Sequence, residues 1–93
     1  MAIRITAVHL EGGNAHEHIQ ELRWVLQSSG KVGQSSRQSI VSWIEEGEKA
    51  FVEEPGAPRV EVRVVDPGAG RAKYLQTYAD GVKTNNLLHL PRY

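Results

Sequence analysis

The sequence contains no cysteine, so neither a disulfide nor a thiolate can contribute to folding, metal binding or catalysis. Aromatic residues make up only 6% of the 93 residues, and large core side chains are therefore expected mainly from Trp24, Trp43 and Phe51. No segment approaches the roughly 18 consecutive apolar residues that cross a bilayer, and the first residues, MAIRITAVHL, alternate instead of forming a signal-peptide run. We therefore expect a cytoplasmic protein without membrane contact.

A net charge is also missing, because 11 basic and 11 acidic side chains cancel. The molecule as a whole therefore has no field that attracts nucleic acid or an anionic membrane. The charges are nevertheless segregated along the chain. Residues 45–54 hold five glutamates against Lys49 alone, whereas beyond Pro67 only Asp80 opposes four cations: Arg71, Lys73, Lys83 and Arg92. This segregation indicates either two solvated faces or a dipolar molecule whose acidic end meets the basic end of a neighbour.

Residues 1–93 are expected to form a single domain, because the chain is too short for two cores. Apolar alternation predicts strands near residues 3–10 and 18–26, and the break in phase at Val8 and Leu10 predicts a bulge in the first. Residues 28–36 are interpreted as a polar loop leading to a helix over residues 36–46. Ser35 or Ser36 would cap that helix, and Gly47 would end it.

Four further strands are predicted, and the last two form a hairpin about Asp80–Gly81, a dipeptide that type I′ turns favour. The order β-β-α-β-β-β-β predicts an α+β fold, in which a mostly antiparallel sheet of five to six strands carries one helix on one face. One helix cannot cover so many strands. The uncovered part of the sheet must therefore curl, be polar or contact another subunit.

Two motifs carry a resemblance to a known family. The first is His-Glu-His-Ile at His16–Ile19 after a glycine turn, and the second is Tyr-Ala-Asp-Gly-Val at Tyr78–Val82, followed by Asn86–Leu88, Leu90 and Pro91. Over almost its whole length the chain resembles a bacterial and phage-associated family of small proteins known as domain of unknown function thirty-eight ninety-two. The chain departs from that pattern in having Lys83 where an aromatic residue is common. The resemblance implies a stable module and no particular mechanism.

The histidines form the first candidate site. His16 and His18 would point the same way on a strand, and His9 could lie across the turn, so the three form a candidate polar cluster for a metal- or histidine-dependent enzyme. The alternative is that His16 or His18 caps backbone groups at the Gly12–Gly13 turn. A metal site would need more ligands than these residues supply, and the serines fit helix capping, so we expect no metal, no cofactor and no catalytic residue.

The terminal hairpin is the second candidate site. Pairing about its turn places Leu75, Ala79 and Val82 on a core face, and the opposite face then carries a predicted binding surface of Tyr74, Gln76, Tyr78, Lys83 and Asn85. We therefore expect a non-enzymatic binding module that acts through its sheet surface or edge on a protein or small ligand. A homo-oligomer, most simply a dimer, is expected to form through this face. A nucleic-acid accessory protein using the basic C-terminal third is the alternative.

Overall fold

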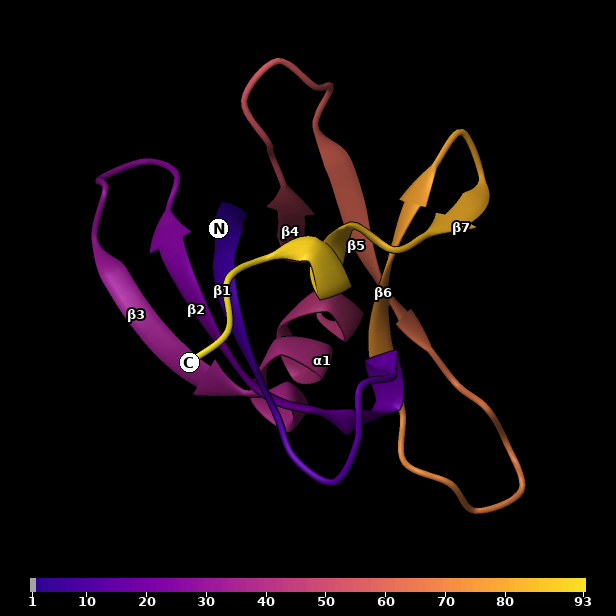
Figure 1. Ribbon diagram of the computed structural model, residues 1–93. Helices are drawn as coiled ribbons and strands as arrows, with labels where there is room; N and C mark the ends of the chain where they lie inside the picture. Colours follow the sequence, from indigo (N-terminus) through magenta and orange to yellow (C-terminus); the bar gives the residue numbers. More distant parts are fainter. Residues whose placement is uncertain (1) are drawn as a thin grey trace.

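The computed structural model describes residues 2–93 and confirms an α+β fold, with one α-helix, two short 3-10 helices and a seven-stranded sheet (Figure 1). The sheet has one strand more than predicted. The elements in chain order are β1 (Ala2–Leu10), η1 (His16–His18), β2 (Ile19–Leu26), β3 (Val32–Ser36), α1 (Arg37–Glu45), β4 (Lys49–Val52), β5 (Val60–Val65), β6 (Tyr74–Ala79), β7 (Val82–Thr84) and η2 (Asn86–His89).

The strand order in the sheet is β3-β2-β1-β4-β5-β6-β7. Neighbouring strands are antiparallel except for β1 and β4, which run parallel. The sheet therefore consists of two antiparallel halves, β3-β2-β1 and β4-β5-β6-β7, that meet at one short parallel seam. Helix α1 connects the outer strand of the first half to the inner strand of the second, as a parallel connection requires.

The predicted bulge lies in β1. The pairing with β2 shifts register between Ile5 and Ala7, so Thr6 is the extra residue. Ile3 and Ile5 face the core before the shift, and Val8 faces it after the shift. In a regular strand Val8 would point to the opposite side from Ile5, because their positions differ by an odd number of residues. The bulge thus keeps one apolar side of β1 inward along its whole length.

The stretch predicted as a polar loop contains the strand that sequence analysis missed. Val32–Ser36 forms β3, which pairs with β2 from Val25↔Val32 to Glu21↔Ser36. Its sequence, VGQSS, has one apolar side chain and no alternation, so no periodic signal marks it. The strand forms because β2 offers it an open backbone edge.

Helix α1 begins one residue after the predicted cap. Ser36 is the N-cap, and its Oγ accepts a hydrogen bond from the Ser39 amide at 3.2 Å. Gly47 has a φ of 102° and donates to the Ile44 carbonyl, which confirms its role in ending the helix. The helix buries Ile40 and Val41 against the sheet.

The sheet curls around α1, so the helix sits inside an arc of strands and not on a flat layer (Figure 1). The concave side contains the core, to which every strand but β3 and β7 contributes fully or mostly buried side chains: Ile3, Ile5, Val8, Ile19, Leu22, Ala50, Val52, Val60, Val62 and Leu75. Helix η2 adds Leu87, which is completely buried. Curling is thus how this fold manages strands that one helix cannot cover.

The tryptophans pack less deeply than predicted. Trp24 and Trp43 are both half-buried at the margin of the core, and their rings meet edge to face with centroids 5.8 Å apart. Phe51 is buried, but on the opposite side of the sheet from α1. Core volume therefore comes mainly from aliphatic side chains.

The segment after η2 returns to β1. The Val8 amide donates to the Pro91 carbonyl at 3.0 Å, and the Tyr93 amide donates to the Val8 carbonyl at 3.3 Å. This short parallel bridge pairs with the part of β1 that follows Arg4, where the pairing of β1 with β4 has ended. Within residues 2–93 no helix is long and apolar enough to span a membrane.

Candidate binding face

The side of the sheet that faces away from α1 carries most of the predicted binding residues. In β6, Leu75 and Thr77 are buried, so the alternate residues Tyr74, Gln76 and Tyr78 point outward. Ala79 pairs with Val82, and Tyr78 pairs with Lys83, as the hairpin register predicted.

Two details of the hairpin differ from the prediction. The ladder ends at Thr77↔Thr84, so Asn85 lies exposed beyond it, and the Gln76 side chain donates to the Thr84 carbonyl at 3.3 Å instead of facing Asn85. Val82, predicted to lie in the core, is 66% exposed. Strand β7 is the last in the sheet, and its hairpin projects beyond α1 (Figure 1). Val82 therefore remains largely open to solvent.

The strand registers align one outward residue from each of five strands in a single row. Arg4 of β1 pairs with Phe51 of β4, Phe51 with Glu61 of β5, Glu61 with Tyr78 of β6, and Tyr78 with Lys83 of β7. At about 4.8 Å between strands, the row is about 19 Å long. It reads cation, aromatic, carboxylate, aromatic, cation. We call the outward side of β4–β7, together with Arg4, the convex face.

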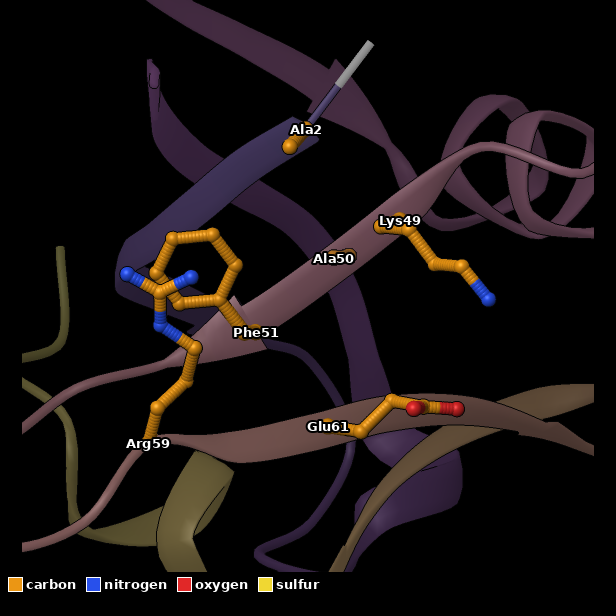
Figure 2. Close-up of a pocket in the computed structure, with 6 residues that line it drawn as sticks. All are labelled: Ala2, Lys49, Ala50, Phe51, Arg59 and Glu61. Carbon is orange, nitrogen blue, oxygen red and sulfur yellow. The ribbon is translucent and has the colours of Figure 1, made fainter.

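Phe51 is only 4% exposed, because an arginine covers it from outside. The Arg59 guanidinium lies 3.9 Å from the ring centroid, and its Nε is 3.6 Å from the Glu53 carboxylate. Figure 2 shows the guanidinium over the ring and Lys49 extending from the same strand in the other direction. Residues including Lys49, Phe51, Arg59 and Glu61 line a hollow of about 360 Å³ here, which is the size of a small ligand site.

Tyr78 has an arginine beside it as well. The Arg63 guanidinium lies 5.1 Å from the Tyr78 ring centroid, while its Nε donates to the Glu61 carboxylate at 2.9 Å. A second hollow runs along Arg63 and Tyr78, and it shares Arg59 and Glu61 with the first. The two hollows therefore adjoin each other at Arg59 and Glu61.

Positive charge exceeds negative charge on the convex face. Four carboxylates lie on or beside it: Glu53 and Glu61, each already paired with an arginine, Glu54 in a hollow with Arg4, and Asp80 in the hollow with Tyr78. Five cations lie there: Arg4, Lys49, Arg59, Arg63 and Lys83. Within the part of the chain that the structure describes, Arg4, Lys49 and Lys83 have no carboxylate within 4 Å. Asp80 lies in the hairpin turn, three residues before Lys83 in the sequence.

Two of the four cations beyond Pro67 pair with carboxylates of the same molecule, and a third bonds to a neutral amide. Lys73 reaches the Glu45 carboxylate at 2.6 Å, and Arg71 reaches that of Glu17 at 3.2 Å. Arg92 donates to the Asn14 side chain at 3.0 Å. The basic C-terminal third therefore contributes mainly Lys83 to the convex face, whose other cations come from earlier segments.

The three candidate histidines do not converge. His16 and His18 lie in η1 and not on a strand, so they do not share a strand face as predicted. His18 Nδ1 accepts from the Ala15 amide at 3.2 Å, and its ring lies so close to Gly13 that a Cβ there would meet it at 2.5 Å. This contact resembles the capping alternative. Within residues 2–93 no three acidic or histidine side chains lie close enough together to hold a metal ion.

His9 and His16 differ in their electrostatics. Hydrogen bonding to the Tyr93 main-chain oxygen and then to Glu11 raises the pKa of His9. Partial burial without compensating charge lowers the pKa of His16. His9 also stacks at an angle on Tyr93, whose ring lies 4.0 Å from the Arg23 guanidinium carbon. These contacts hold the C-terminal segment against β1 and β2.

Thr77 is a structural residue that sequence analysis missed. Its fully buried Oγ1 accepts from the Asn86 amide at 3.2 Å and bonds to both the carbonyl and the Oγ1 of Thr84. One hydroxyl thus joins β6, β7 and the start of η2. Arg37, another buried polar residue, donates to the Glu17 carbonyl at 2.8 Å and fixes η1 on the helix. Neither role has a sequence signal.

The comparisons with known proteins give one result. The sequence pattern of a family described as "Protein of unknown function (DUF3892)" matches residues 4–91. This confirms the resemblance carried by the motifs at His16–Ile19 and Tyr78–Val82. No curated protein and no solved structure matches the chain.

Proposed function

We propose that this chain, which belongs to the DUF3892 family of proteins of unknown function, is a binding module that holds an anionic ligand on its convex face. The observation that carries the proposal is the row from Arg4 to Lys83, in which register places a cation at each end and aromatic rings between. Strands hold such side chains more rigidly than loops do, and a preorganised surface binds with a smaller entropy cost.

The unpaired cations supply the sign of the ligand. Among residues 2–93, neither Lys49 nor Lys83 has a carboxylate within 4 Å, so an incoming anion meets charges that these residues leave free. Arg59 and Arg63 instead lie at aromatic rings and against carboxylates, which orients their guanidinium groups. An anion with flat apolar parts matches this surface better than a small inorganic ion does.

We propose that the protein is not an enzyme and that it is located in the cytoplasm. His9 bonds to the Tyr93 main-chain oxygen, His18 accepts from the Ala15 amide, and the Ser36 and Ser39 hydroxyls bond to each other in the helix cap. Within residues 2–93 no hydrogen bond between a serine and a histidine side chain supports an enzyme. The lack of cysteine is unlike the composition of small secreted domains, which depend on disulfides.

The test is an NMR titration of the isotope-labelled protein with three anionic probes: inorganic polyphosphate, a polyglutamate peptide and a short oligothymidylate. We expect the amides of Phe51, Glu61 and Tyr78 to shift with at least one probe. The double change Lys49→Glu and Lys83→Glu should abolish these shifts, whereas the matched change Lys31→Glu, in the β2–β3 turn, should preserve them. Absence of shifts on the convex face with all three probes would refute the proposal.

Self-association is a second candidate function, and one observation favours an edge rather than the hairpin face. The outer strand β3 has no charged side chain over its five residues, and Val32 is 70% exposed. Proteins usually protect such edges with charges, prolines or bulges. The opposite edge, β7, is three residues long and carries Lys83. We therefore propose a dimer through β3.

Light scattering at high concentration tests the dimer. Val32→Lys should reduce the mass from twice 10.3 kDa to a single copy, while Val82→Lys, at the other edge, should leave the dimer intact. A wild-type mass of one copy, or equal effects of the two changes, would count against pairing through β3.

A further inference from the structure

We infer that the anionic ligand of the convex face is single-stranded nucleic acid, laid across β4–β7 with its backbone at the ends of the row and its bases over the middle. This inference rests on the proposed function, because it names the ligand class of the same face. It depends on three features of that face: the spacing of the cations, the rings between them and the position of Glu61.

The cations mark where phosphates would lie. Lys83 ends the row in β7 and Arg4 ends it in β1, while Lys49 lies two residues before Phe51 along β4. Glu61, in the middle of the row, is already neutralised by Arg63, so the cations without such a pair lie toward the ends of the row. A strand crossing the row therefore has its phosphates drawn toward the two ends, with a base over the centre.

The rings mark where bases would lie. Tyr78 is half-buried, with one strand between it and Phe51, so the two rings are about 10 Å apart along the row. Arg59 covers Phe51, and Arg63 lies beside Tyr78, so each ring adjoins a guanidinium plane on which a base can stack. Aromatic and arginine platforms of this kind recognise unpaired bases in single strands.

The shape of the face favours a single strand over other anions. The two adjoining hollows extend from Lys49 past Arg59 and Glu61 to Tyr78 on the outward side of the sheet. A duplex presents no base face to these rings, and an acidic peptide supplies carboxylates without flat rings. Glu61 and Asn86, which line the second hollow, offer hydrogen-bonding groups to base edges.

Fluorescence polarisation of a labelled oligothymidylate of about twelve nucleotides tests the inference. We expect binding at low salt, with Tyr78→Ala weakening it about 5- to 100-fold, as expected for one stacked base. Tyr78→Phe, which keeps the ring, should bind like the wild type. Lys49→Gln and Lys83→Gln should each reduce the slope of log K against log salt by about 0.7, while Lys31→Gln leaves the slope unchanged.

A competition experiment separates bases from phosphate charge. Unlabelled oligothymidylate should displace the probe at lower phosphate concentration than inorganic polyphosphate or a duplex of the same length. If polyphosphate competes equally and Tyr78→Ala has no effect, the face recognises charge alone, and the inference fails while the anion-binding proposal survives. If the oligonucleotide does not bind while polyglutamate shifts the face in NMR, the partner is an acidic protein and the inference also fails. If no anion binds the face, both proposals fail.

Discussion

The indole of Trp24 lies directly against Gly33 on the neighbouring strand, where a Cβ would be 2.2 Å from Trp24 Cζ2. The ring is held by a hydrogen bond from its Nε1 to Ser35 Oγ at 3.1 Å and by its edge-to-face contact with Trp43 of α1. The glycine therefore makes space for a ring that joins β3, β2 and the helix. An aromatic covering a glycine across strands is a known way to stabilise an edge.

Gly33→Ala should therefore destabilise the protein by about 1–3 kcal/mol, although alanine is normally favoured over glycine in a strand. The new methyl group would push Trp24 away from Ser35 and Trp43. Chemical denaturation of the single variants and of the double variant with Trp24→Leu measures this. If the clash is the cause, the penalty of Gly33→Ala should shrink markedly in the Trp24→Leu background. An unchanged penalty would point to the backbone instead.

Leu87→Ala should cost about 2–5 kcal/mol of unfolding free energy, because Leu87 of η2 is completely buried among residues of β1 and β6. His89→Ala, two residues further on in the same 3-10 helix, is exposed and provides the matched control. Thermal unfolding of both variants should show a large decrease in Tm for the first and almost none for the second. Similar effects of the two changes would mean that η2 is not part of the core.

Thr77→Val should cost about 1–3 kcal/mol, since it leaves the Asn86 amide and Thr84 groups without their buried partner. Thr77→Ser keeps the hydroxyl and should be much closer to the wild type. Hydrogen exchange gives the sharper readout, because the Asn86 amide should lose protection in the valine variant alone. Retained protection of Asn86 in Thr77→Val would show that the threonine does not join the hairpin to η2.

The pKa values of His9 and His16 should move apart. The Tyr93 oxygen and Glu11 raise that of His9, so its NMR midpoint should lie above about 6.5, whereas burial should place that of His16 below about 6.5. Glu11→Gln should lower the His9 midpoint partly, because the Tyr93 contact remains, and should not affect His16. Coincident midpoints would contradict both contacts.

The two histidines have opposite effects on stability against pH. The contribution of His9 is present below about pH 6.5 and is lost as pH rises through its raised folded pKa. That of His16 is present above about pH 6.5 and is lost as pH falls through its lowered folded pKa. Denaturation of His9→Ala should therefore reveal a steeper loss of stability on acidification than the wild type shows.

Metal removal should leave the fold unchanged. The described residues bring no three acidic or histidine ligands together, and the core is built from aliphatic side chains of the sheet, α1 and η2. Circular dichroism with excess chelator should give the same thermal midpoint as without it. A decrease in that midpoint, or stoichiometric zinc in the purified protein, would contradict this prediction.

Sequence reasoning identified the parts of the fold that have periodic signals. The alternating strand at residues 3–10, the serine before α1 and the Asp80–Gly81 turn each lie where predicted, because each depends on neighbouring residues alone. Strand β3 was missed because its formation depends on the open edge of β2. Val82 was assigned to the core because alternation gives the side of a strand but not whether anything covers it.

The candidate site was predictable only in part. The hairpin supplied Tyr78 and Lys83 from local pairing, but Phe51 and Arg4 join the same row through registers set by the parallel seam and the β4–β5 pairing. Charge counting along the sequence also misled, since Arg71 and Lys73 pair with distant glutamates within the molecule. Which charges remain free depends on contacts between residues that lie far apart in the sequence. No short segment of the sequence contains that information.

The parallel seam also has a consequence for how the chain folds. Each antiparallel half is built from neighbours in sequence, so both halves can form by fast local pairing. The three pairs from Ala2↔Lys49 to Arg4↔Phe51, and the bridge from Val8 to Arg92, instead close loops of dozens of residues. Strand β1 is thus expected to acquire its second neighbour late, when the two halves join. Until then the backbone hydrogen-bonding groups on that edge of β1 are unpaired. The protein is therefore most exposed to aggregation during this interval.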